Sequence, residues 1–399
     1  MITVEQATDL ILSHQVDFGK EQVALAETTA RILGSAVRAD RDFPSFNRVA
    51  MDGIAIKYAD FEQGVRQFPI EAVAAAGRPQ QSLKAKAHCL EVMTGVILPK
   101  GVDTVIRYED IVVKNSVAHL QIEAIKARQN VHHQANDRAK DSILITKGKR
   151  INAAEIGVAA SVGCTHLEVS KVPKTLIIST GDELVDIEAT PLPHQIRRSN
   201  SYQLAAALQS LKITADLQHL QDDLDQLTQK LHTFLASYDL LILSGGVSKG
   251  KFDFVPKVLE DLGVRRHFHK IKQRPGKPIW FGTHPTQKTT IFALPGNPVS
   301  AFMCLHRYVI PWIEQSMGYI AAPKVFAQLQ RDITFQPDLT YFAQVKCQVK
   351  ETGQICAYPL EGKGSGDLAN LVDADGFLEL PRGSNLYKAG EHFRYWSYR

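Results

Sequence analysis

The sequence has little cysteine, no strong charge of either sign and no long apolar run. Its 399 residues include five scattered cysteines, and none of them forms a Cys-x-x-Cys pair. The odd number and the spacing argue against a disulfide framework and against a zinc site. Reduced, buried thiols in a cytoplasmic protein are the expected state of Cys89, Cys164, Cys304, Cys347 and Cys356.

The charge balance and the apolar pattern exclude further classes. The net charge of +4 is too weak to indicate a nucleic-acid partner. No apolar stretch approaches the roughly 20 residues that a membrane helix needs, and the first residues lack a basic, apolar signal pattern. We therefore expect a cytoplasmic protein with no membrane and no nucleic-acid partner, and its length predicts more than one domain of about 100–200 residues.

The chain is organised around residues 239–253, Asp-Leu-Leu-Ile-Leu-Ser-Gly-Gly-Val-Ser-Lys-Gly-Lys-Phe-Asp. The apolar run at 240–243 is typical of a strand that is covered on both faces. Gly245 and Gly246 allow a tight turn and a close approach of the backbone to a ligand. A helical pattern follows and stops at Gly263. Ligands of open α/β sheets bind at the edge where such a strand–loop–helix unit turns.

The same stretch contains the spacing Gly-x4-Gly-Lys of a P-loop, from Gly245 to Lys251. A P-loop continues with Ser or Thr, which binds magnesium, and Phe252 stands there instead. The sequence therefore disfavours an ATP-hydrolysing P-loop and leaves a phosphate-cradling glycine turn of another kind.

Strand and helix patterns alternate between residues 173 and 320, which predicts a parallel sheet with helices on both faces. Short β-type runs between turn signals dominate from about 50 to 140 and from 325 to 399, and these predict an inserted β domain and a C-terminal β domain. The expected strands of the sheet are 175–179, 240–243 and 290–294, and its expected helices are 201–211, 223–236, 254–262 and 298–310, the last kinked or ended by Pro311. The first domain is expected to hold a helix at 3–14 with Thr3 and Gln6 as a capping box, a strand and helix within 22–38, a strand at 143–145 and a helix at 153–161.

Three loops follow the apolar strands and are expected to meet at one edge of the sheet. They are Ser179-Thr-Gly-Asp-Glu-Leu184, the turn after Ser244, and Leu294-Pro-Gly-Asn-Pro-Val-Ser300. In the last, Asn297 and Pro298 suit the N-cap and the first position of a helix. Each loop alone is equally consistent with an ordinary turn or cap, but three at one edge predict a ligand site.

A basic stretch, residues 265–277, could add cations to an anionic ligand. A solvated basic strand is the alternative, and we prefer it for Arg265 and Arg266. His267 and His269 could face one way on a strand, but no third ligand is near them in sequence, which disfavours a metal site.

Acidic residues are numerous, and carboxylates beside phosphate-binding loops commonly hold magnesium. Surface solvation explains most of them equally well. Asp253 has the best independent case, because it follows Gly246 at the start of a helical pattern. His132 and His133 show no partner pattern and are expected to be solvated.

The motifs together resemble the molybdopterin molybdenumtransferase family, the molybdenum insertases, which includes bacterial MoeA and the E domain of gephyrin. The matching pieces occur in the family's order over nearly the whole chain. They are Phe46-Asn-Arg-Val-Ala-Met-Asp-Gly53, Met93-Thr-Gly95, Gln129-Asn-Val, Ser179-Thr-Gly-Asp-Glu-Leu184, Ser199-Asn200, Asp222-Asp223, Ser244-Gly-Gly-Val-Ser248 with Gly250 and Asp253, Pro275-Gly-Lys-Pro278, Leu294-Pro-Gly-Asn-Pro-Val-Ser300, and Gly364-Ser-Gly366 with Ala374-Asp-Gly376.

The resemblance implies a multidomain fold of α/β and β parts. Domain I is mixed α/β and discontinuous (1–45 and 141–172), and domain II is an inserted β domain (46–140). Domain III is a MogA-like α/β molybdopterin-binding domain (173–322) with a parallel-rich sheet and helices on both faces, and domain IV is a C-terminal β barrel (323–399). An elongated homodimer whose cleft takes residues from both subunits is also implied.

The implied reaction inserts molybdate into adenylylated molybdopterin, releases AMP and forms molybdenum cofactor, with Mg²⁺ as the divalent cation. A molybdopterin adenylyltransferase would be the upstream partner, and molybdoenzymes would be the acceptors.

The resemblance also implies residue roles. Asp222 and Asp253 would help to hold Mg²⁺ or to position the adenylyl phosphate. The N–H groups of Gly245 and Gly246 would cradle the ligand. The implied catalytic residues are Asp52, Thr94, Asp137, Glu183, Asp222 and Asp253. The implied substrate-binding residues are Ser179, Thr180, Gly181, Asp182, Asn200, Ser244, Gly245, Gly246, Val247, Ser248, Pro295, Gly296, Asn297 and Pro298, together with Lys270, Arg274 and Lys277 for molybdate or phosphate.

The chain departs from the family pattern at Val49, where Ser is common, and at Ile54, where Tyr is common. Ala135 and Asn136 stand where Gly-Glu usually precedes the acid matched by Asp137. Two alternatives to an insertase remain. A non-catalytic molybdopterin-binding or scaffold member is disfavoured by the retained acids, and a molybdopterin adenylyltransferase is disfavoured by the additional β domains.

Overall fold

The computed structural model describes residues 1–246, 254–362 and 364–399. The chain divides into two compact units. The large unit comprises Met1–Ser35, Lys147–Ile156 and His166–Arg399, and the small unit comprises Ala36–Thr146 and Gly157–Thr165. Within the described ranges, no helix has the length and apolar character required to cross a membrane.

A six-stranded mixed sheet forms the core of the large unit. Its order is β16 (Asp216–Leu220), β13 (Thr175–Thr180), β17 (Leu240–Ser244), β21 (Thr290–Leu294), β20 (Trp280–Thr283) and β18 (Arg265–His269). The first four strands are parallel, and β20 and β18 are antiparallel to their neighbours. Ser179 is in register with Ser244, and Ser244 with Leu294. The three loops that follow β13, β17 and β21 therefore begin at one edge of the sheet, as predicted.

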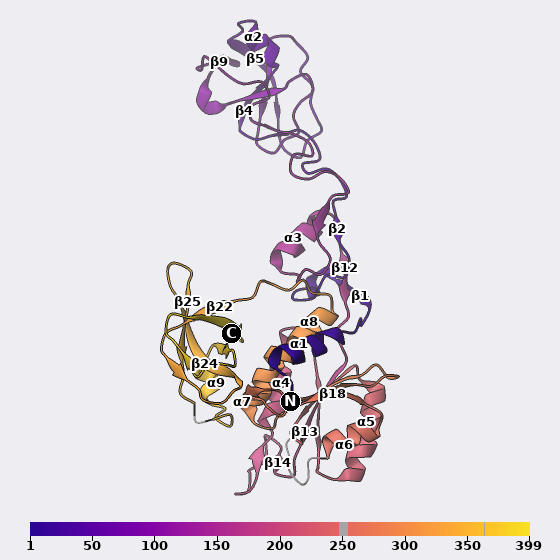
Figure 1. The fold of residues 1–399 in the computed structure, drawn as a ribbon. Helices are drawn as coiled ribbons and strands as arrows, with labels where there is room; N and C mark the ends of the chain where they lie inside the picture. The colour runs from indigo at the N-terminus through magenta and orange to yellow at the C-terminus, as the bar shows by residue number, and fades with distance from the viewer. Residues whose placement is uncertain (247–253, 363) are drawn as a thin grey trace. The chain divides into compact units, whose positions relative to one another are not determined.

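Helices cover both faces of this sheet (Figure 1). On one face, Leu176 and Leu241 pack with α5 (Leu224–Ser237) and α6 (Val255–Asp261). On the other face, Ile177 and Ile242 pack with three helices. These are α1 (Val4–Ser13), α4 (Ser199–Gln209) and α7 (Pro298–Cys304). Alternate strand residues thus enter opposite cores, which explains why the strands read as unbroken apolar runs.

The helix boundaries follow from local chemistry, with two corrections. Thr3 and Gln6 form the predicted capping box at the start of α1. Pro311 does not end the last helix. The helix passes through a π turn at Leu305–Val309, directly before Pro311, and continues as α8 (Ile310–Ser316). Of the two outcomes predicted at Pro311, the end is therefore wrong, and the irregularity is the π turn that precedes it. The helix expected within 22–38 is absent from the structure, which has β1 (Lys20–Ala24), a 3-10 turn at Leu25–Glu27 and β2 (Val37–Arg38) there.

The C-terminal part of the large unit is a closed β barrel. Its ring consists of β24 (Thr340–Val349), β25 (Ile355–Pro359), β22 (Phe326–Leu329), β28 (His392–Ser397) and β26 (Gly376–Leu380), and β26 pairs again with β24. A short strand from the basic stretch, β19 (Gln273–Arg274), pairs in parallel with β24. Barrel residues Phe342 and Phe377 share one apolar core with Phe302 of α7. The barrel is therefore packed against the helix that starts at the third loop.

The small unit is built mainly on a six-stranded sheet with short connections. Its order is β7 (Thr104–Arg107), β4 (Gly53–Ile56), β6 (Cys89–Val92), β5 (Gln67–Ala74), β9 (Val117–Leu120) and β8 (Ile111–Lys114). Two short antiparallel pairs form separate two-stranded sheets, β3 (Arg48–Val49) with β10 (Val131–His132), and β2 with β11 (Ile143–Ile145). A short helix, α2 (Tyr58–Glu62), was not predicted, whereas α3 (Ala153–Ser161) occupies the predicted residues. The predicted fold class, α/β sheet, β domain and C-terminal barrel, is confirmed, and the domain boundaries stay a prediction.

Candidate active site

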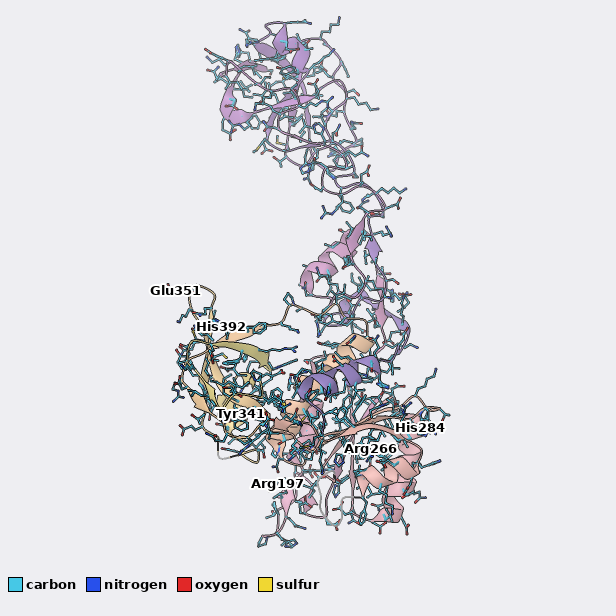
Figure 2. The ribbon with its side chains drawn as sticks, viewed as in Figure 1. Arg197, Arg266, His284, Tyr341, Glu351 and His392 are labelled. Carbon is cyan, nitrogen blue, oxygen red and sulfur yellow. The ribbon has the colours of Figure 1, made fainter. Side chains whose placement is uncertain are left out.

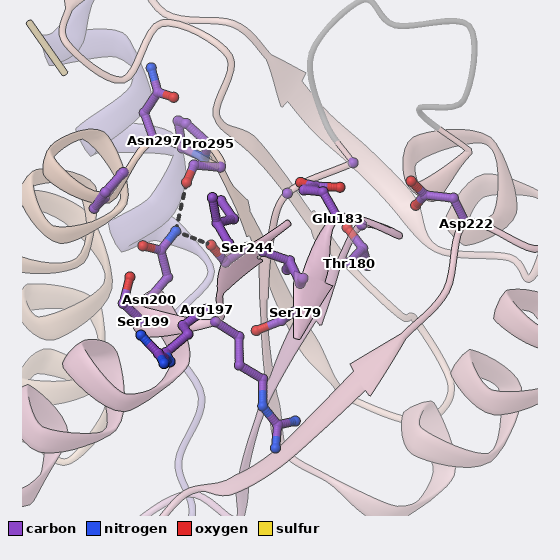
Figure 3. Close-up of a pocket in the computed structure, with 18 of the residues that line it drawn as sticks. Ser179, Thr180, Glu183, Arg197, Ser199, Asn200, Asp222, Ser244, Pro295 and Asn297 are labelled. Carbon is purple, nitrogen blue, oxygen red and sulfur yellow. Dashed lines mark hydrogen bonds between the residues drawn. The ribbon is translucent and has the colours of Figure 1, made fainter. Parts of the chain in front are cut away.

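The loops after β13, β17 and β21 enclose a cavity of about 460 Å³ at the edge of the sheet (Figure 3). We call it the strand-end pocket. Most of the predicted substrate-binding residues line it, together with Glu183 and Asp222 from the predicted catalytic set, although they come from five separate segments of the chain. They are Ser179, Thr180, Gly181, Glu183, Asn200, Asp222, Ser244, Gly245, Gly246, Pro295, Gly296, Asn297 and Pro298.

Asn200 connects two of the three loops. Its Nδ2 donates to Ser244 Oγ at 2.9 Å and to the carbonyl of Gly296 at 2.7 Å, as the dashed lines in Figure 3 show. The N–H of Gly245 donates to the carbonyl of Leu294 at 3.2 Å. That N–H is therefore used within the protein, and the prediction that it cradles the ligand is wrong for Gly245. The same role for the N–H of Gly246 stays a prediction.

The glycine turn leaves no room for side chains. Gly245 has φ +103°, and a Cβ there would lie 2.6 Å from the carbonyl oxygen of Thr180. Gly246 has φ +67°, and a Cβ there would lie 2.8 Å from Cγ2 of Val255. Backbone conformation and packing both require glycine, so the turn brings bare backbone to the pocket wall.

Two hydroxyls of the first loop lack hydrogen-bond partners. Ser179 Oγ and Thr180 Oγ1 are buried, and neither has a partner among the described residues. An unpaired buried hydroxyl costs about 1–3 kcal/mol, which a ligand oxygen at the pocket would recover. The strand-end pocket therefore suits a ligand rich in acceptor oxygens, such as a phosphate ester.

The adjacent acids Asp222 and Asp223 have different positions. Asp222 lines the pocket, and its N–H donates to Asp182 Oδ1 at 3.1 Å. Asp223 is the N-cap of α5 and accepts from the N–H of Gln226 at 2.7 Å. Asp182 thus fixes the backbone of Asp222, whereas Asp223 caps the N-terminus of α5.

A divalent cation fits the carboxylates of the pocket only with help from the ligand. Glu183 and Asp222 both line it, and the described residues contain no group of three metal-binding side chains. Mg²⁺ commonly takes one or two carboxylates and completes its shell with substrate phosphates and water, so this set fits Mg²⁺ beside a phosphorylated ligand. The predictions for Asp253, Val247 and Ser248 lie outside the described residues.

Sequence reasoning missed two arginines of the pocket, Arg197 and Arg198. Arg197 ends β15 (Ile196–Arg197), which pairs with β14 (Leu184–Val185), and Arg198 follows it directly. Arg198 pairs with Asp186, and Arg197 donates from Nε to the carbonyl of Ala189 at 3.0 Å. An arginine pair directly before a predicted helix was the available signal. The pocket also includes Leu184, Ile196, Ser199 and Pro278.

A second cavity, of about 360 Å³, lies between the basic stretch, the third loop and the barrel. We call it the barrel-side pocket. It shares Pro278, Pro295 and Asn297 with the strand-end pocket, so the two cavities are neighbours. The exposed cations Arg274 and Lys277 line it, as expected for an oxyanion site. Lys270 lines neither cavity, and its role stays a prediction.

The barrel adds an unpaired donor to this second cavity. Gln344 of β24 is 9% exposed, and its buried Nε2 has no partner among the described residues. Its Oε1 accepts from Asn370. Asn297 is the N-cap of α7, but its side chain donates to Ser365 Oγ at 2.6 Å instead of capping the helix. No sequence pattern identified Gln344, because a single amide in a β strand is ordinary.

The remaining predicted catalytic residues lie in the small unit. Asp52 accepts from the N–H of Thr94 at 2.5 Å and from its hydroxyl at 2.7 Å, and these bonds lower the pKa of Asp52. Asp137 Oδ1 lies 2.8 Å from Nε2 of His132. His132 thus has a partner that no sequence pattern indicated, although it stays partly exposed, and His133 is exposed as predicted.

The basic strand β18 is solvated at its start, as preferred above. Arg265 and Arg266 are exposed, and Arg266 lies with His284 on the side of the sheet away from Tyr341 of the barrel (Figure 2). His267 packs against His14, with ring centroids 3.8 Å apart, and contacts Thr283 Oγ1 at 2.8 Å. It is thus a half-buried packing residue.

Fold and site together define an α/β protein with a phosphate-suited pocket beside an oxyanion-suited pocket. Three family profiles match successive parts of the chain. They describe the MoeA N-terminal region (domain I and II) at residues 2–163, a probable molybdopterin binding domain at 176–315, and the MoeA C-terminal region (domain IV) at 327–398.

Similar proteins cover the whole chain. A molybdopterin molybdenumtransferase of Synechocystis sp. is 39% identical over 404 residues, and the match covers all of both chains. One of Synechococcus elongatus is 31% identical over 98% of each. The crystal structure of the molybdopterin biosynthesis MoeA protein from Pyrococcus horikoshii matches with a TM-score of 0.84 at 26% identity, covering 100% of this chain and 99% of that one. The chain belongs to the MoeA-type molybdopterin molybdenumtransferase family.

Proposed function

We propose that this transferase inserts molybdate into adenylylated molybdopterin, releasing AMP and forming molybdenum cofactor. The observation that carries the proposal is the adjacency of two pockets of complementary chemistry, which share Pro278, Pro295 and Asn297. Relatives over the full length are named molybdopterin molybdenumtransferases, which supports molybdopterin and molybdate as the substrates.

The strand-end pocket would bind the pterin phosphate and its adenylyl group. The unpaired hydroxyls of Ser179 and Thr180 would donate to phosphate oxygens. Asn200 would hold the second and third loops at a constant separation through Ser244 and Gly296. Because these groups are already in position, little of the ligand's binding free energy is lost in ordering them.

Glu183 and Asp222 would hold Mg²⁺ at this pocket, and the resemblance adds Asp253. The bound cation would neutralise charge on the phosphoanhydride while it is cleaved. Asp182 would contribute by fixing the backbone of Asp222 through the 3.1 Å hydrogen bond.

The barrel-side pocket would bind molybdate. Arg274 and Lys277 supply positive charge, and Gln344 supplies the unpaired amide donor. Donors fixed before the reaction stabilise an oxyanion without reorganisation cost. Because the two pockets share a wall, molybdate would lie next to the adenylylated substrate, which favours in-line attack by the oxyanion and departure of AMP.

We further propose a homodimer whose cleft uses residues of both subunits, with Asp52, Thr94 and Asp137 contributed by the inserted domain. A molybdopterin adenylyltransferase would supply the substrate, and molybdoenzymes would accept the product. Light scattering of the purified protein tests the dimer, and a monomer at micromolar concentration would contradict it.

The function is tested by giving the pure protein adenylylated molybdopterin, Mg²⁺ and molybdate. We expect AMP in equal amount to active cofactor, and no AMP without molybdate. Binding of the pterin substrate with no release of AMP would instead support a non-catalytic molybdopterin-binding or scaffold protein. Failure to bind it would contradict both.

A further inference from the structure

Two buried polar side chains hold the loop that carries Arg274 and Lys277. Gln273 is 0% exposed and Tyr308 is 1% exposed. The Tyr308 hydroxyl donates to Oε1 of Gln273, and Nε2 of Gln273 donates to the carbonyl of Gly276 at 3.1 Å. This chain of hydrogen bonds ends on the backbone between the two cations.

Packing leaves this loop little freedom. Gly276 has φ +83°, and a Cβ there would lie 2.6 Å from Sγ of Cys304 and 2.8 Å from Nε2 of Gln273. The N–H of Ile271 also donates to the carbonyl of Lys277 at 3.0 Å. Buried groups thus set the position of the loop backbone, although its two charged side chains are exposed.

The helical turn that contains Tyr308 also binds the barrel. Arg307 precedes Tyr308 in the π turn Leu305–Val309 and is 5% exposed. Its guanidinium binds Glu379 of β26 at 3.0 and 3.3 Å, and Nε1 of Trp396 donates to the same carboxylate at 2.7 Å. Consecutive side chains of one turn therefore hold the barrel and the basic loop, which form two of the three walls of the barrel-side pocket.

We propose that Tyr308 and Gln273 are positioning residues for molybdate. They hold the 274–277 loop so that Arg274 and Lys277 converge on the oxyanion before it binds. The inference rests on the proposed function, because it takes molybdate as the ligand of the barrel-side pocket. The physical reason is preorganisation: Arg and Lys lose much side-chain entropy on binding, and a mobile backbone would add to that cost.

Two substitutions test the hydrogen-bond chain. Tyr308→Phe keeps the ring and removes the hydroxyl, and Gln273→Met keeps the side-chain length and removes both hydrogen bonds. We expect the KM for molybdate to rise about tenfold in Tyr308→Phe, the effect of one lost buried hydrogen bond, and by at least as much in Gln273→Met. Both kcat at saturating molybdate and the KM for adenylylated molybdopterin should stay within about twofold, since binding alone is weakened.

Tyr387→Phe is a matched control. Tyr387 is 2% exposed, and its hydroxyl donates to the carbonyl of Pro381 at 2.6 Å within the barrel. The variant loses a comparable buried hydrogen bond and lines neither pocket. We expect a lower thermal midpoint and an unchanged KM for molybdate.

Equilibrium binding of molybdate to the full chain, without the pterin substrate, separates failure of the inference from failure of the function. Weaker binding in both variants, with wild-type binding in Tyr387→Phe, supports the positioning role. Wild-type affinity and KM in both variants would overturn that role and leave the function intact. Loss of folding in both, or an equal fall of kcat and both substrate affinities, would also overturn it, because the pair would then be structural. A wild-type chain that neither binds molybdate nor releases AMP overturns the function itself.

Discussion

Gly245 is a residue of the strand-end pocket that tolerates little change. Ala there must adopt φ +103° and place its Cβ 2.6 Å from the carbonyl oxygen of Thr180. We expect Gly245→Ala to destabilise the protein by about 2 kcal/mol or more and to abolish binding of adenylylated molybdopterin. Unfolding in denaturant and pterin binding measure the two effects.

Gly157 provides the control for that substitution. It lies in the exposed middle of α3, with no atom within 4 Å of an added Cβ. Ala at this position should stabilise the helix by about 0.5–1 kcal/mol and leave substrate binding unchanged. Equal effects of the two substitutions would contradict the steric account of Gly245.

The pKa of Asp52 depends on both donors of Thr94, the N–H first and the hydroxyl second. Thr94→Val removes only the hydroxyl, so we expect the pKa of Asp52 to rise part of the way towards its ordinary value. A carboxyl whose pKa is lowered by folding contributes stability above its unfolded pKa and loses it as pH falls through the folded pKa. Thr94→Val should therefore lose less folding stability than the wild type as the pH falls from the unfolded pKa of Asp52 through its folded pKa.

Carboxyl titration by NMR measures this change, and Thr94→Ser serves as the control that keeps both donors. An unchanged pKa in Thr94→Val would show that the 2.7 Å hydroxyl contact is absent in solution.

At the scale of elements, the π turn carries a histidine that must stay neutral. The ring of His306 packs against those of Phe302 and Tyr398, with ring centroids 4.4 and 5.9 Å away. Its Nε2 is buried without a partner among the described residues. Burial lowers the pKa of His306 to about 4. Because the unfolded chain binds this proton near pH 6.5, stability falls as pH drops from about 6.5 towards 4.

His306→Phe removes the titrating group and keeps the aromatic contacts. We expect the variant to lose less stability than the wild type between pH 7 and pH 4, by about 1–3 kcal/mol. Thermal midpoints across this range provide the measurement. Parallel pH profiles of the two proteins would show that His306 is not a source of the acid sensitivity.

Elements with a strong local signal were predictable from the sequence. The strands β13, β17 and β21 read as apolar runs because both faces are buried, and α1 carries its capping box in Thr3 and Gln6. The π turn was not predicted, and its residues Arg307 and Tyr308 make tertiary contacts with the barrel and the basic loop that no local pattern indicates. Short pieces such as α2 are held by tertiary contacts that override weak propensity.

At the scale of the whole molecule, the strand-end pocket was predictable because parallel strands end at one edge of a sheet. Its residues Ser179, Ser244 and Pro295 follow from that rule alone. Gln344 was not predictable, since its role depends on the barrel closing beside the third loop. The partner of His132 was missed because a five-residue separation gives no pattern outside regular structure.

The central claim is that two neighbouring pockets hold the two substrates separately, and paired KM measurements test it most directly. Asn200→Ala, in the strand-end pocket, should raise the KM for adenylylated molybdopterin about tenfold and leave that for molybdate nearly unchanged. Lys277→Ala, in the barrel-side pocket, should raise the KM for molybdate at least about tenfold and leave the KM for adenylylated molybdopterin nearly unchanged. Equal changes of both constants in each variant, or the opposite assignment, would contradict the account.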